Sequence, residues 1–449
     1  MVTSQVWHKE ILPVLDSALS SKKFHAKGQI GRWVVESIGD DPHIHEFFSL
    51  NWKKVSLHSR ADVRSWHVAH IQDLRAVQKL LGLDSAEGVA AHRDQFLEFL
   101  KDPRFRICLK DPDLINIEKF SDEKQKEIAL RAPAFIFCPE ERASLSLNTT
   151  YYGQFKSKAC LGMLEEFLLD QARLNEQGAV TNYPDLWISM HAGAVEYVTE
   201  KKEKRGVVIV GPTGHSKSTH AYGLSTAKKQ NRMHSDDWLF INADTGTVLA
   251  AEQSFYMRTV MAGFYPELGP IFLSQPLENV PGVQDLTDPQ EVLPQLCKTL
   301  ASRAMMDWGA IWDASKLTQE VQLTDLFLVK RDYQDPVLFE KISADRMVGL
   351  LISEENVFQY ANGKQDAQGN PALEQRTTEF YYNPYLCRVE IDPKTKMTGD
   401  MDRVRLSAWR HLAGLKGLRI FSMNARLPVP EMQERLRRFL ESDEEKVQL

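Results

Sequence analysis

A short apolar run at residues 206–210, with the sequence GVVIV, leads directly into a loop that contains two glycines and a proline. A run of this length is too short for a helix and is typical of a buried strand. After the loop, we expect a helix from about residue 218 to 229. Because loop amides and a helix N-terminus can together surround an anion, this unit predicts an α/β fold and marks its loop as a candidate phosphate site.

The loop reads Gly-Pro-Thr-Gly-His-Ser-Lys-Ser-Thr and is similar to the phosphate-loop pattern G-x-x-x-x-G-K-[ST]. Lys217 can place its charge between the β- and γ-phosphates of ATP or GTP, and the Ser218 hydroxyl can ligate Mg²⁺. Ser216 stands where the pattern has its second glycine, and a positive φ there would cost about 1 kcal/mol. The alternative is a turn that uses Gly and Pro only to reverse the chain. The predicted nucleotide-binding residues are Gly211, Thr213, Gly214, His215, Ser216, Lys217, Ser218 and Thr219.

Two adjacent carboxylates, Asp236 and Asp237, follow the loop lysine by about twenty residues. A metal ion bound to nucleotide phosphates needs an acidic partner, directly or through water. The pair can also be an exposed turn or the cap of some element. Its distance from the loop favours a metal site, and His215 and His234 are further candidates for contacts with phosphate or substrate.

Composition excludes several classes of protein. The net charge of −6 and the pI of about 6.1 argue against a general nucleic-acid binder. The five cysteines are widely spaced without a C-x-x-C pair, which favours a reducing cytoplasm over a disulfide or zinc framework. There is no apolar core of a signal peptide near the start and no run of about 18 apolar residues, so we expect no membrane partner. The oligomeric state is left open.

Periodicity elsewhere predicts a mixture of helices and strands. Helices are expected at residues 63–82, 86–100, 291–306, 343–352 and 430–440, with a fraying acidic tail beyond. Strands are expected at residues 134–138, 186–191, 195–198, 239–242, 248–251, 255–260, 326–329 and 418–423, and a polar loop at 362–370. We expect a domain boundary near residue 200, which divides the chain into domains 1–200 and 201–449.

Further blocks accompany the loop and the acidic pair in a fixed order. Residues 151–157 read YYGQFKS, residues 189–192 SMHA, residues 235–237 SDD, residues 252–259 EQSFYMRT and residues 277–280 LENV. In this order they resemble the Y-A-G-E-M-K-K, S-M-H-C, G-D-D, E-G-G-C-Y-A-K-T and L-E-N-V segments of the phosphoenolpyruvate carboxykinase family, whose relatives are the HPr kinases. The family's loop reads like G-x-[ST]-G-x-G-K-[ST]-T, and this chain departs from it at Ser216. The likeness covers the middle third of the chain, from residue 149 to 280.

The resemblance implies a carboxykinase-like fold, with an N-terminal α/β domain on the acceptor side followed by a mixed-sheet, phosphate-loop domain. It implies that His191 and Asp237 bind Mn²⁺ and that Lys156 faces substrate. Ser218 and an aspartate of the pair Asp236–Asp237 would hold the nucleotide's Mg²⁺. The expected catalytic residues are Lys217, Arg258 and Lys156, of which the last two would neutralise the moving phosphoryl group. Asp236 would be the general base, as in kinases whose acidic residue accepts the acceptor proton.

Departures from the family concern its substrate. The chain has no G-R-S-P-x-D-K segment, no arginine in residues 281–289, and no adenine-binding stretch near its C-terminus. We therefore expect phosphoryl transfer from ATP or GTP to a small-molecule or protein acceptor other than oxaloacetate. Two alternatives stay open. One is a divergent carboxykinase that recruits arginines such as Arg142, Arg331 or Arg376; the other is a regulatory nucleotide-binding protein whose site has decayed at Ser157 and Ser216.

Overall fold

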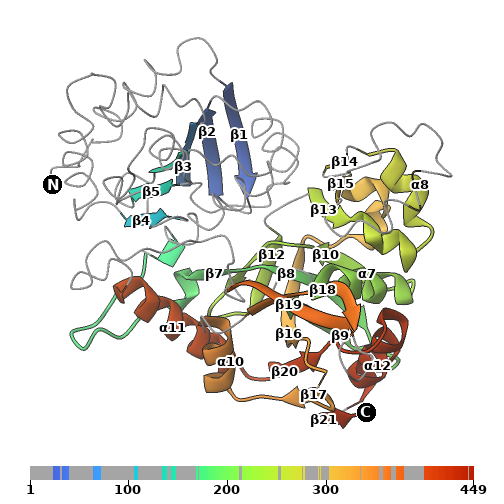
Figure 1. Ribbon diagram of the computed structural model, residues 1–449. Helices are drawn as coiled ribbons and strands as arrows, with labels where there is room; N and C mark the ends of the chain where they lie inside the picture. The colour runs from blue at the N-terminus through green and yellow to red at the C-terminus, as the bar shows by residue number, and fades with distance from the viewer. Residues whose placement is uncertain are drawn as a thin grey trace, which may run out of the picture. The chain divides into compact units, whose positions relative to one another are not determined.

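The structure is a computed structural model that describes residues 24–30, 33–39, 64–71, 106–109, 134–138, 143–147, 168–169, 171–211, 215–250, 254–275, 277–278, 292, 294, 303–333, 335–352, 357–365, 371–378, 399–442 and 444–449. The chain forms two compact units, each described by itself (Figure 1). The first comprises Met1–Asn182 and Tyr385–Leu406, and the second comprises Tyr183–Pro384 and Ser407–Leu449. Residue 200, where the sequence suggested a boundary, lies in the second unit.

The first unit contains a six-stranded mixed sheet in the order β1-β2-β3-β6-β5-β4. Its strands are β1 (Phe24–Ile30), β2 (Trp33–Gly39), β3 (Arg64–Ile71), β4 (Arg106–Leu109), β5 (Ala134–Cys138) and β6 (Ala143–Leu147). β3 pairs in parallel with β2 and β6, and the other neighbours pair antiparallel. The strand expected at 134–138 is confirmed as β5.

The helix expected at residues 63–82 is wrong in its first half, because Arg64–Ile71 forms strand β3. Its apolar residues fit a helical stripe, but Trp66 and Val68 also alternate with His67 as a strand requires. Hydrogen bonding to a strand on each side decides between the two patterns, and the sequence does not reveal those partners. Residues 72–82 and the helix expected at 86–100 lie outside the described residues.

The second unit is built on a ten-stranded mixed sheet, so the chain belongs to the mixed α/β class. Its main path runs β10-β8-β9-β16-β12-β11-β7, and β20, β17 and β21 extend it beside β16. The strands are β7 (Trp187–Met190), β8 (Ala192–Val198), β9 (Lys204–Val210), β10 (Arg232–Ser235), β11 (Leu239–Asn242), β12 (Thr247–Ala250), β16 (Glu320–Lys330), β17 (Val337–Lys341), β20 (Arg419–Asn424) and β21 (Lys446–Gln448). β16 lies parallel to both β9 and β20.

Two short connections, here called the strand crossings, carry the chain from one end of this sheet to near the other. β7 at one end continues into β8 near the other end through the single residue His191, and β10 continues into β11 through residues 236–238. The 11-residue strand β16 serves both halves, because its first residues pair with β12 and its later residues with β9 and β20. The two crossings are adjacent, because the strands on each side of them are paired. Met190 of β7 pairs with Leu239 of β11, and Ala194 of β8 pairs with Ser235 of β10.

Helices and smaller sheets complete the structure. The helices are α7 (Lys217–Ala227), α8 (Leu268–Leu273), α10 (Ala344–Ile352), α11 (Gly399–Ala413) and α12 (Val429–Glu441), with short 3-10 helices η3 (Tyr183–Asp185), η4 (Thr259–Gly263), η5 (Trp308–Ala310) and η6 (Ala314–Lys316). A three-stranded sheet has the order β13 (Ser254–Arg258), β15 (Arg303–Asp307), β14 (Leu277–Glu278), and β18 (Val357–Gln365) pairs with β19 (Pro371–Thr378).

The apolar run at 206–210 is buried on both faces of the sheet. Val207 and Ile209 join the core formed with α7 and α12, whereas Val208 and Val210 are buried on the opposite face. Burial on both faces explains why this strand is continuously apolar instead of alternating. In the core, the rings of Phe327, Phe339, Phe421 and Phe439 pack together, with the stacked pair Phe339–Phe439 at 4.5 Å between centroids.

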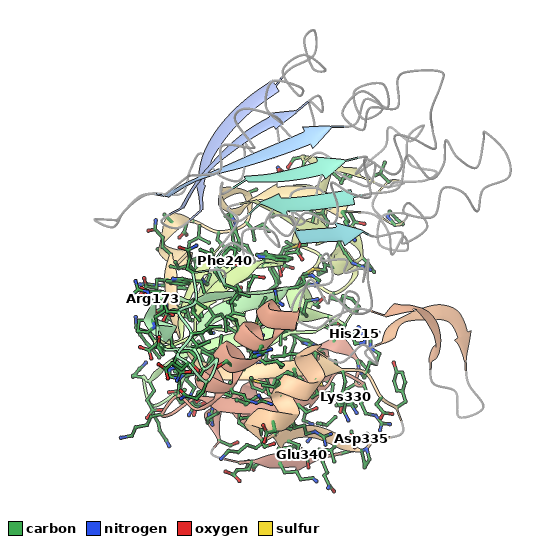
Figure 2. The ribbon with its side chains drawn as sticks, turned by 90° about the vertical axis from the view of Figure 1, so that its left-hand side faces the viewer. Arg173, His215, Phe240, Lys330, Asp335 and Glu340 are labelled. Carbon is green, nitrogen blue, oxygen red and sulfur yellow. The ribbon has the colours of Figure 1, made fainter. Side chains whose placement is uncertain are left out.

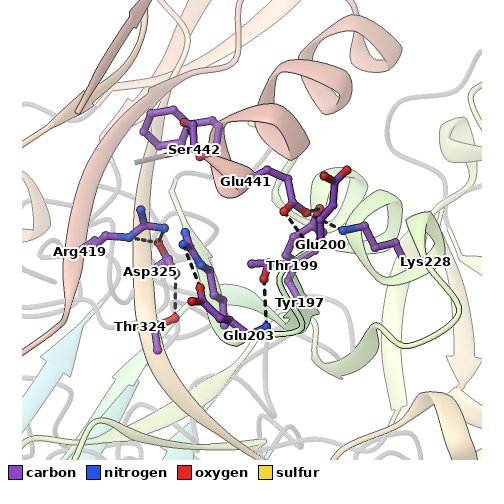
Figure 3. Close-up of polar contacts among 12 residues, drawn as sticks. Tyr197, Thr199, Glu200, Glu203, Lys228, Thr324, Asp325, Arg419, Glu441 and Ser442 are labelled. Carbon is purple, nitrogen blue, oxygen red and sulfur yellow. Dashed lines mark hydrogen bonds and ion pairs between the residues drawn. The ribbon is translucent and has the colours of Figure 1, made fainter. Parts of the chain in front are cut away.

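A polar cluster fastens the end of α12 to β8 and α7 (Figure 3). Glu441, the last residue of α12, accepts hydrogen bonds from the Tyr197 hydroxyl at 2.7 Å and the Glu200 amide at 2.8 Å. It also pairs with Lys228 Nζ at 2.5 Å, just beyond α7. The helix that carries the candidate loop is thereby held at its C-terminal end, away from the loop.

Three further expectations are corrected. The tail after residue 440 does not fray, because Lys446–Gln448 forms β21 beside β17 and Lys446 pairs with Glu340 at 2.9 Å. The helix expected at 291–306 does not reach its predicted end, because Arg303–Asp307 forms β15 between two strands. The polar loop expected at 362–370 is strand β18 up to Gln365. In each case pairing with a strand distant in sequence overrides the local pattern.

Gly206 gives a direct test of this packing. We expect Gly206→Ala to lower the free energy of unfolding by about 3 kcal/mol, because the added Cβ would overlap the Gln322 carbonyl oxygen and lie 2.5 Å from Val321 Cγ1. Gly349→Ala is the matched control: nothing lies within 4 Å of its Cβ, and alanine should stabilise α10 by about 0.5–1 kcal/mol. Urea unfolding of both variants measures the difference; equal values would contradict the β9–β16 pairing.

Candidate functional site

The sequence-predicted strand and helix are found as β9 and α7, and of the loop between them the structure describes Gly211, His215 and Ser216. Gly211 packs directly on β16, since a Cβ at this position would lie 2.9 Å from the Val329 carbonyl oxygen. α7 begins at Lys217, and the His220 amide donates to the Ser216 carbonyl at 2.9 Å in its first turn. Of the predicted nucleotide-binding residues, Thr213 and Gly214 lie outside the described residues.

Ser216 adopts the left-handed conformation that its glycine-like position suggested. Its φ is 64° and its ψ is 20°, in a region that costs non-glycine residues roughly 1 kcal/mol. The side chain makes a specific contact, because its Oγ accepts a hydrogen bond from Arg331 Nη2 at 3.2 Å. The strain is therefore accompanied by an interaction that glycine cannot make.

The start of α7 concentrates positive potential. Lys217 is its first residue and is only 5% exposed, and His215, Thr219 and His220 beside it are also buried. The first amides of a helix carry partial positive charge, so a lysine here adds to the helix dipole instead of offsetting it. Ser218 in the same turn is half-buried. This arrangement favours binding of an anion.

The helix is also held firmly near this end. The Thr219 carbonyl accepts hydrogen bonds from the Tyr265 hydroxyl at 3.1 Å and from Gln433 Nε2 at 3.0 Å. The ring of Tyr265 packs edge-on against Tyr222 at 4.5 Å between centroids. Side chains from the segment after η4 and from α12 thus fix the position of the first turn.

His191 and Asp237 meet at the two adjacent strand crossings. His191 Nε2 lies 2.6 Å from Asp237 Oδ1, and both side chains are largely buried. The Ala192 amide donates to the Asp237 carbonyl at 3.2 Å, and Ser235 Oγ donates to the Trp238 carbonyl at 2.8 Å. Asp237 has a φ of 87°, a conformation that aspartate and asparagine tolerate better than most residues.

Asp236 lies between this crossing and α7, and its side chain is 1% exposed. The position of Gly193 shows how close the elements are: its ideal Cβ would lie 3.5 Å from Asp236 Oδ1 and 3.8 Å from the Lys217 carbonyl. The structure therefore brings together Asp236 and the start of α7, which are separated in sequence. Gly193 permits this approach, since its Cβ would also lie 2.9 Å from Ala221 Cβ.

The two further predicted catalytic residues are Arg258 and Lys156. Arg258 is the last residue of β13, in the three-stranded sheet, and it pairs with Arg303 of β15. The chain after it forms η4 and then Tyr265, which contacts α7. Lys156 lies outside the described residues.

Arg331 contacts the loop, whereas the sequence suggested it only as an arginine that could bind a dicarboxylate substrate. It follows β16, and Figure 2 shows the preceding Lys330 on the same side of the second unit as His215. Besides Ser216, its Nε donates to the Ala425 carbonyl at 3.4 Å, so it joins the segments after β9 and β20. Parallel strands end at one edge, and this rule was the signal that could have found it.

Asn424 at the end of β20 shapes the segment that carries Arg331. It is fully buried; its Nδ2 donates to the carbonyls of Asp332 at 2.7 Å and Asp335 at 2.9 Å. Its Oδ1 accepts from the Asp332 amide at 2.9 Å. The turn after β16 is therefore fixed by a side chain on the neighbouring parallel strand.

Two histidines near the site are neutral at pH 7. Burial, assisted by the charge of Arg331, lowers the pKa of His220 to about 3. Burial lowers the pKa of His234 to about 4, against the opposing effect of its Nδ1 hydrogen bond to the Thr318 carbonyl at 2.9 Å. His234 is therefore a buried residue whose Nδ1 is engaged with the Thr318 carbonyl.

These pKa values predict acid sensitivity. Between about pH 4 and 6.5 the unfolded chain binds protons that the folded chain does not, so the free energy of unfolding falls as the pH is lowered. From pH 7 to 5 we expect a loss of roughly 4 kcal/mol from these two histidines. His234→Asn, whose amide can replace Nδ1 as donor, should remove about half of the loss in urea unfolding. His411→Asn, which lies against Asp244, serves as control; an unchanged slope for His234→Asn would contradict the assignment.

The His191–Asp237 pair offers a partial metal site. An imidazole nitrogen and a carboxylate oxygen suit Mn²⁺ or a similar ion. Among the described residues, no group of three or more His, Cys, Asp or Glu side chains is arranged around one position. Water or phosphate oxygens would have to complete the coordination shell, as they commonly do beside a nucleotide.

Comparison with known proteins identifies no family for this chain. A scan against protein-family models finds no match for the chain, and a search of curated proteins finds none either. Within the described ranges, no helix has the length and apolar character needed to cross a bilayer.

Proposed function

We propose that this protein is a metal-dependent phosphoryl-transfer enzyme that uses ATP or GTP and has the phosphoenolpyruvate carboxykinase-like fold. The observation that carries the proposal is the convergence of Asp236 on the first turn of α7, where Lys217 stands. Phosphoryl transfer requires an anion-binding loop and an acidic group close to it. A strand–turn–helix that served only to reverse the chain would need neither a buried lysine nor a buried carboxylate there.

Each residue has a role in the proposed reaction. The amides at the start of α7 and the charge of Lys217 hold the phosphates. Asp236 accepts the proton of an acceptor hydroxyl; the acceptor oxygen bonds to the γ-phosphorus, and the bond from that phosphorus to the nucleoside diphosphate breaks. Arg258 and Lys156, assigned by the resemblance, neutralise the charge that develops.

The residues present fit divalent ions. Ser218 and an aspartate of the acidic pair would hold Mg²⁺, and His191 with Asp237 would hold Mn²⁺, because these side chains offer hydroxyl, carboxylate and imidazole donors. Such ions lend positive charge to the phosphates and the acceptor when bound. The chain's own contribution is to keep His191 and Asp237 together at the strand crossings.

The acceptor in this proposal is a small molecule or a protein, bound by the N-terminal part of the chain, and the reaction takes place in the cytoplasm. A second candidate is a divergent carboxykinase that acts on oxaloacetate. The position of Arg331 beside the loop favours this candidate, since a guanidinium can bind a carboxylate. The two candidates share the nucleotide site and differ only in the acceptor.

A nucleotide-consumption assay with Mn²⁺ and Mg²⁺, run with and without oxaloacetate, separates them. Phosphoenolpyruvate and carbon dioxide formed only with oxaloacetate would establish the carboxykinase. Nucleotide binding that oxaloacetate does not change would favour another acceptor, to be sought among hydroxyl compounds and proteins. Chelation by EDTA should abolish turnover in either case. Tight binding without turnover for any acceptor would favour a regulatory protein, and no nucleotide binding at all would reject the proposal.

A further inference from the structure

Arg331 occupies a bridging position at the edge where three parallel strands end. In register, Leu328 of β16 lies beside Val210 of β9, and Lys330 lies beside Asn424 of β20. The residue after β16 is therefore adjacent to the segments that follow both neighbours. Its guanidinium reaches each of them, through Ser216 Oγ at 3.2 Å and the Ala425 carbonyl at 3.4 Å.

The charge of Arg331 is not balanced by a carboxylate. Both of its hydrogen-bond partners are neutral, and among the described residues no Asp or Glu oxygen lies within 4.0 Å of its nitrogens. Burial lowers its pKa from the usual arginine value, although an arginine remains protonated at neutral pH. The adjacent His220 is neutral and so neither balances nor repels this cation. A partly buried cation with neutral partners is favourable when an anion completes the site.

Ser216 links this cation to the loop. The left-handed conformation at this position would suit glycine better, so the serine carries a conformational cost. Its hydroxyl accepts one hydrogen bond from the guanidinium group of Arg331 and so restricts the orientation of that group. The departure from the usual phosphate-loop pattern and the unbalanced arginine are thus two parts of one contact.

We propose that Arg331 binds the terminal phosphate oxygens of the nucleotide and that Ser216 is the positioning residue that orients its guanidinium for this contact. The inference rests on the proposed nucleotide site. The guanidinium presents planar donors that match two phosphate oxygens, which a lysine at the same place cannot do. Arg331 would then distinguish a nucleoside triphosphate from a diphosphate, since only the triphosphate carries the group that it contacts.

Calorimetric titration of the full chain with ATP and ADP, without an acceptor, tests the assignment. We expect Arg331→Gln to weaken ATP binding about 30-fold and ADP binding less than about 3-fold, as for loss of a charge-assisted hydrogen bond. Arg331→Lys should recover part of the loss, which shows that the charge and not the packing is responsible. Arg346→Gln, at an exposed site on α10, is the matched control and should change neither value.

Ser216 is tested by the ratio of the two affinities. Ser216→Gly should reduce the preference for ATP over ADP about 5-fold, and should have little further effect in the Arg331→Gln background, because the two residues act through one contact. A purely structural serine would leave the ratio unchanged.

The outcomes separate the two proposals. If the wild-type protein binds ATP and Arg331→Gln binds it equally well, the nucleotide site stands and the inference is overturned. If Arg331→Gln keeps its ATP affinity but raises the KM for oxaloacetate or another acceptor, Arg331 is an acceptor ligand and the inference is again overturned. If the wild-type protein binds neither nucleotide, the proposed function fails, and the inference fails with it.

Discussion

Lys217→Met should reduce the kcat/KM of nucleotide-dependent phosphoryl transfer about 10³-fold, equivalent to about 4 kcal/mol of transition-state stabilisation. The ammonium group stands at the first position of α7, where the helix amides already attract phosphate. Its removal takes away a positive charge at the start of α7, where the phosphates would carry the charge that develops during transfer. The loss should therefore fall on kcat as well as on nucleotide affinity.

Methionine is the informative replacement because Lys217 is buried. Alanine would leave a cavity and mix a packing defect with the loss of charge, whereas methionine keeps most of the volume. Lys229→Ala removes an exposed lysine beyond the other end of the same helix and serves as control. Full turnover by Lys217→Met would rule out the mechanism as drawn.

The elements around the site were predictable because each is specified locally. The run at 206–210 has no polar residue to tolerate solvent, and the glycine-bearing loop stops the strand before the helix begins. The helices expected at 343–352 and 430–440 are confirmed as α10 and α12, whose apolar residues repeat at helical spacing. The strands expected at 326–329 and 418–423 are likewise confirmed within β16 and β20.

The errors occur where distant pairing decides the structure. β3, β15 and β21 each gain their hydrogen bonds from strands that no local pattern identifies. For β21, Lys446 and Glu445 look like a solvated tail, yet they pair with Glu340 and Lys341 of β17. Charged residues on an edge strand remain solvated while the backbone pairs, so polarity alone does not predict fraying.

The candidate site divides in the same way. The loop and the acidic pair have local spacing that can be recognised, and the conformation of Ser216 follows from its place in the loop pattern. The contact of Arg331 with the loop depends on β16 lying beside β9 in parallel, across more than a hundred residues of sequence. Such a neighbour cannot be read from composition or spacing, which is why the contact of Arg331 with the loop emerges only from the fold.

The closure of the main sheet gives the acidic pair its position. One residue joins β7 to β8 and three residues join β10 to β11. His191 and Asp237 therefore meet at the two strand crossings. Backbone pairing on each side of the crossings, at Met190–Leu239 and Ala194–Ser235, fixes the distance between the two side chains. A contact set by the sheet in this way is pre-organised before any ion binds.

Asp237→Asn should therefore weaken Mn²⁺ binding at least about 100-fold while leaving the backbone unchanged. The amide removes the negative charge that an ion requires, and asparagine accepts the φ of 87° as readily as aspartate. Free Mn²⁺ measured by electron paramagnetic resonance gives the affinity directly. For the wild-type protein, Mn²⁺ at 100 times its Kd should raise the free energy of unfolding by about 2.7 kcal/mol, and the variant should lose this gain.

The chain contains its own control for this experiment. His411 and Asp244 form a second histidine–aspartate pair, with Nε2 2.8 Å from Oδ1. Unlike the first pair, its side chains are exposed to solvent, at 34% and 39%. Asp244→Asn removes the same kind of contact away from the strand crossings and should leave Mn²⁺ affinity unchanged. If Asp237→Asn instead destabilises the metal-free protein and binds Mn²⁺ as the wild type does, the buried pair is a structural link between the two strand crossings, and the metal belongs elsewhere in the chain.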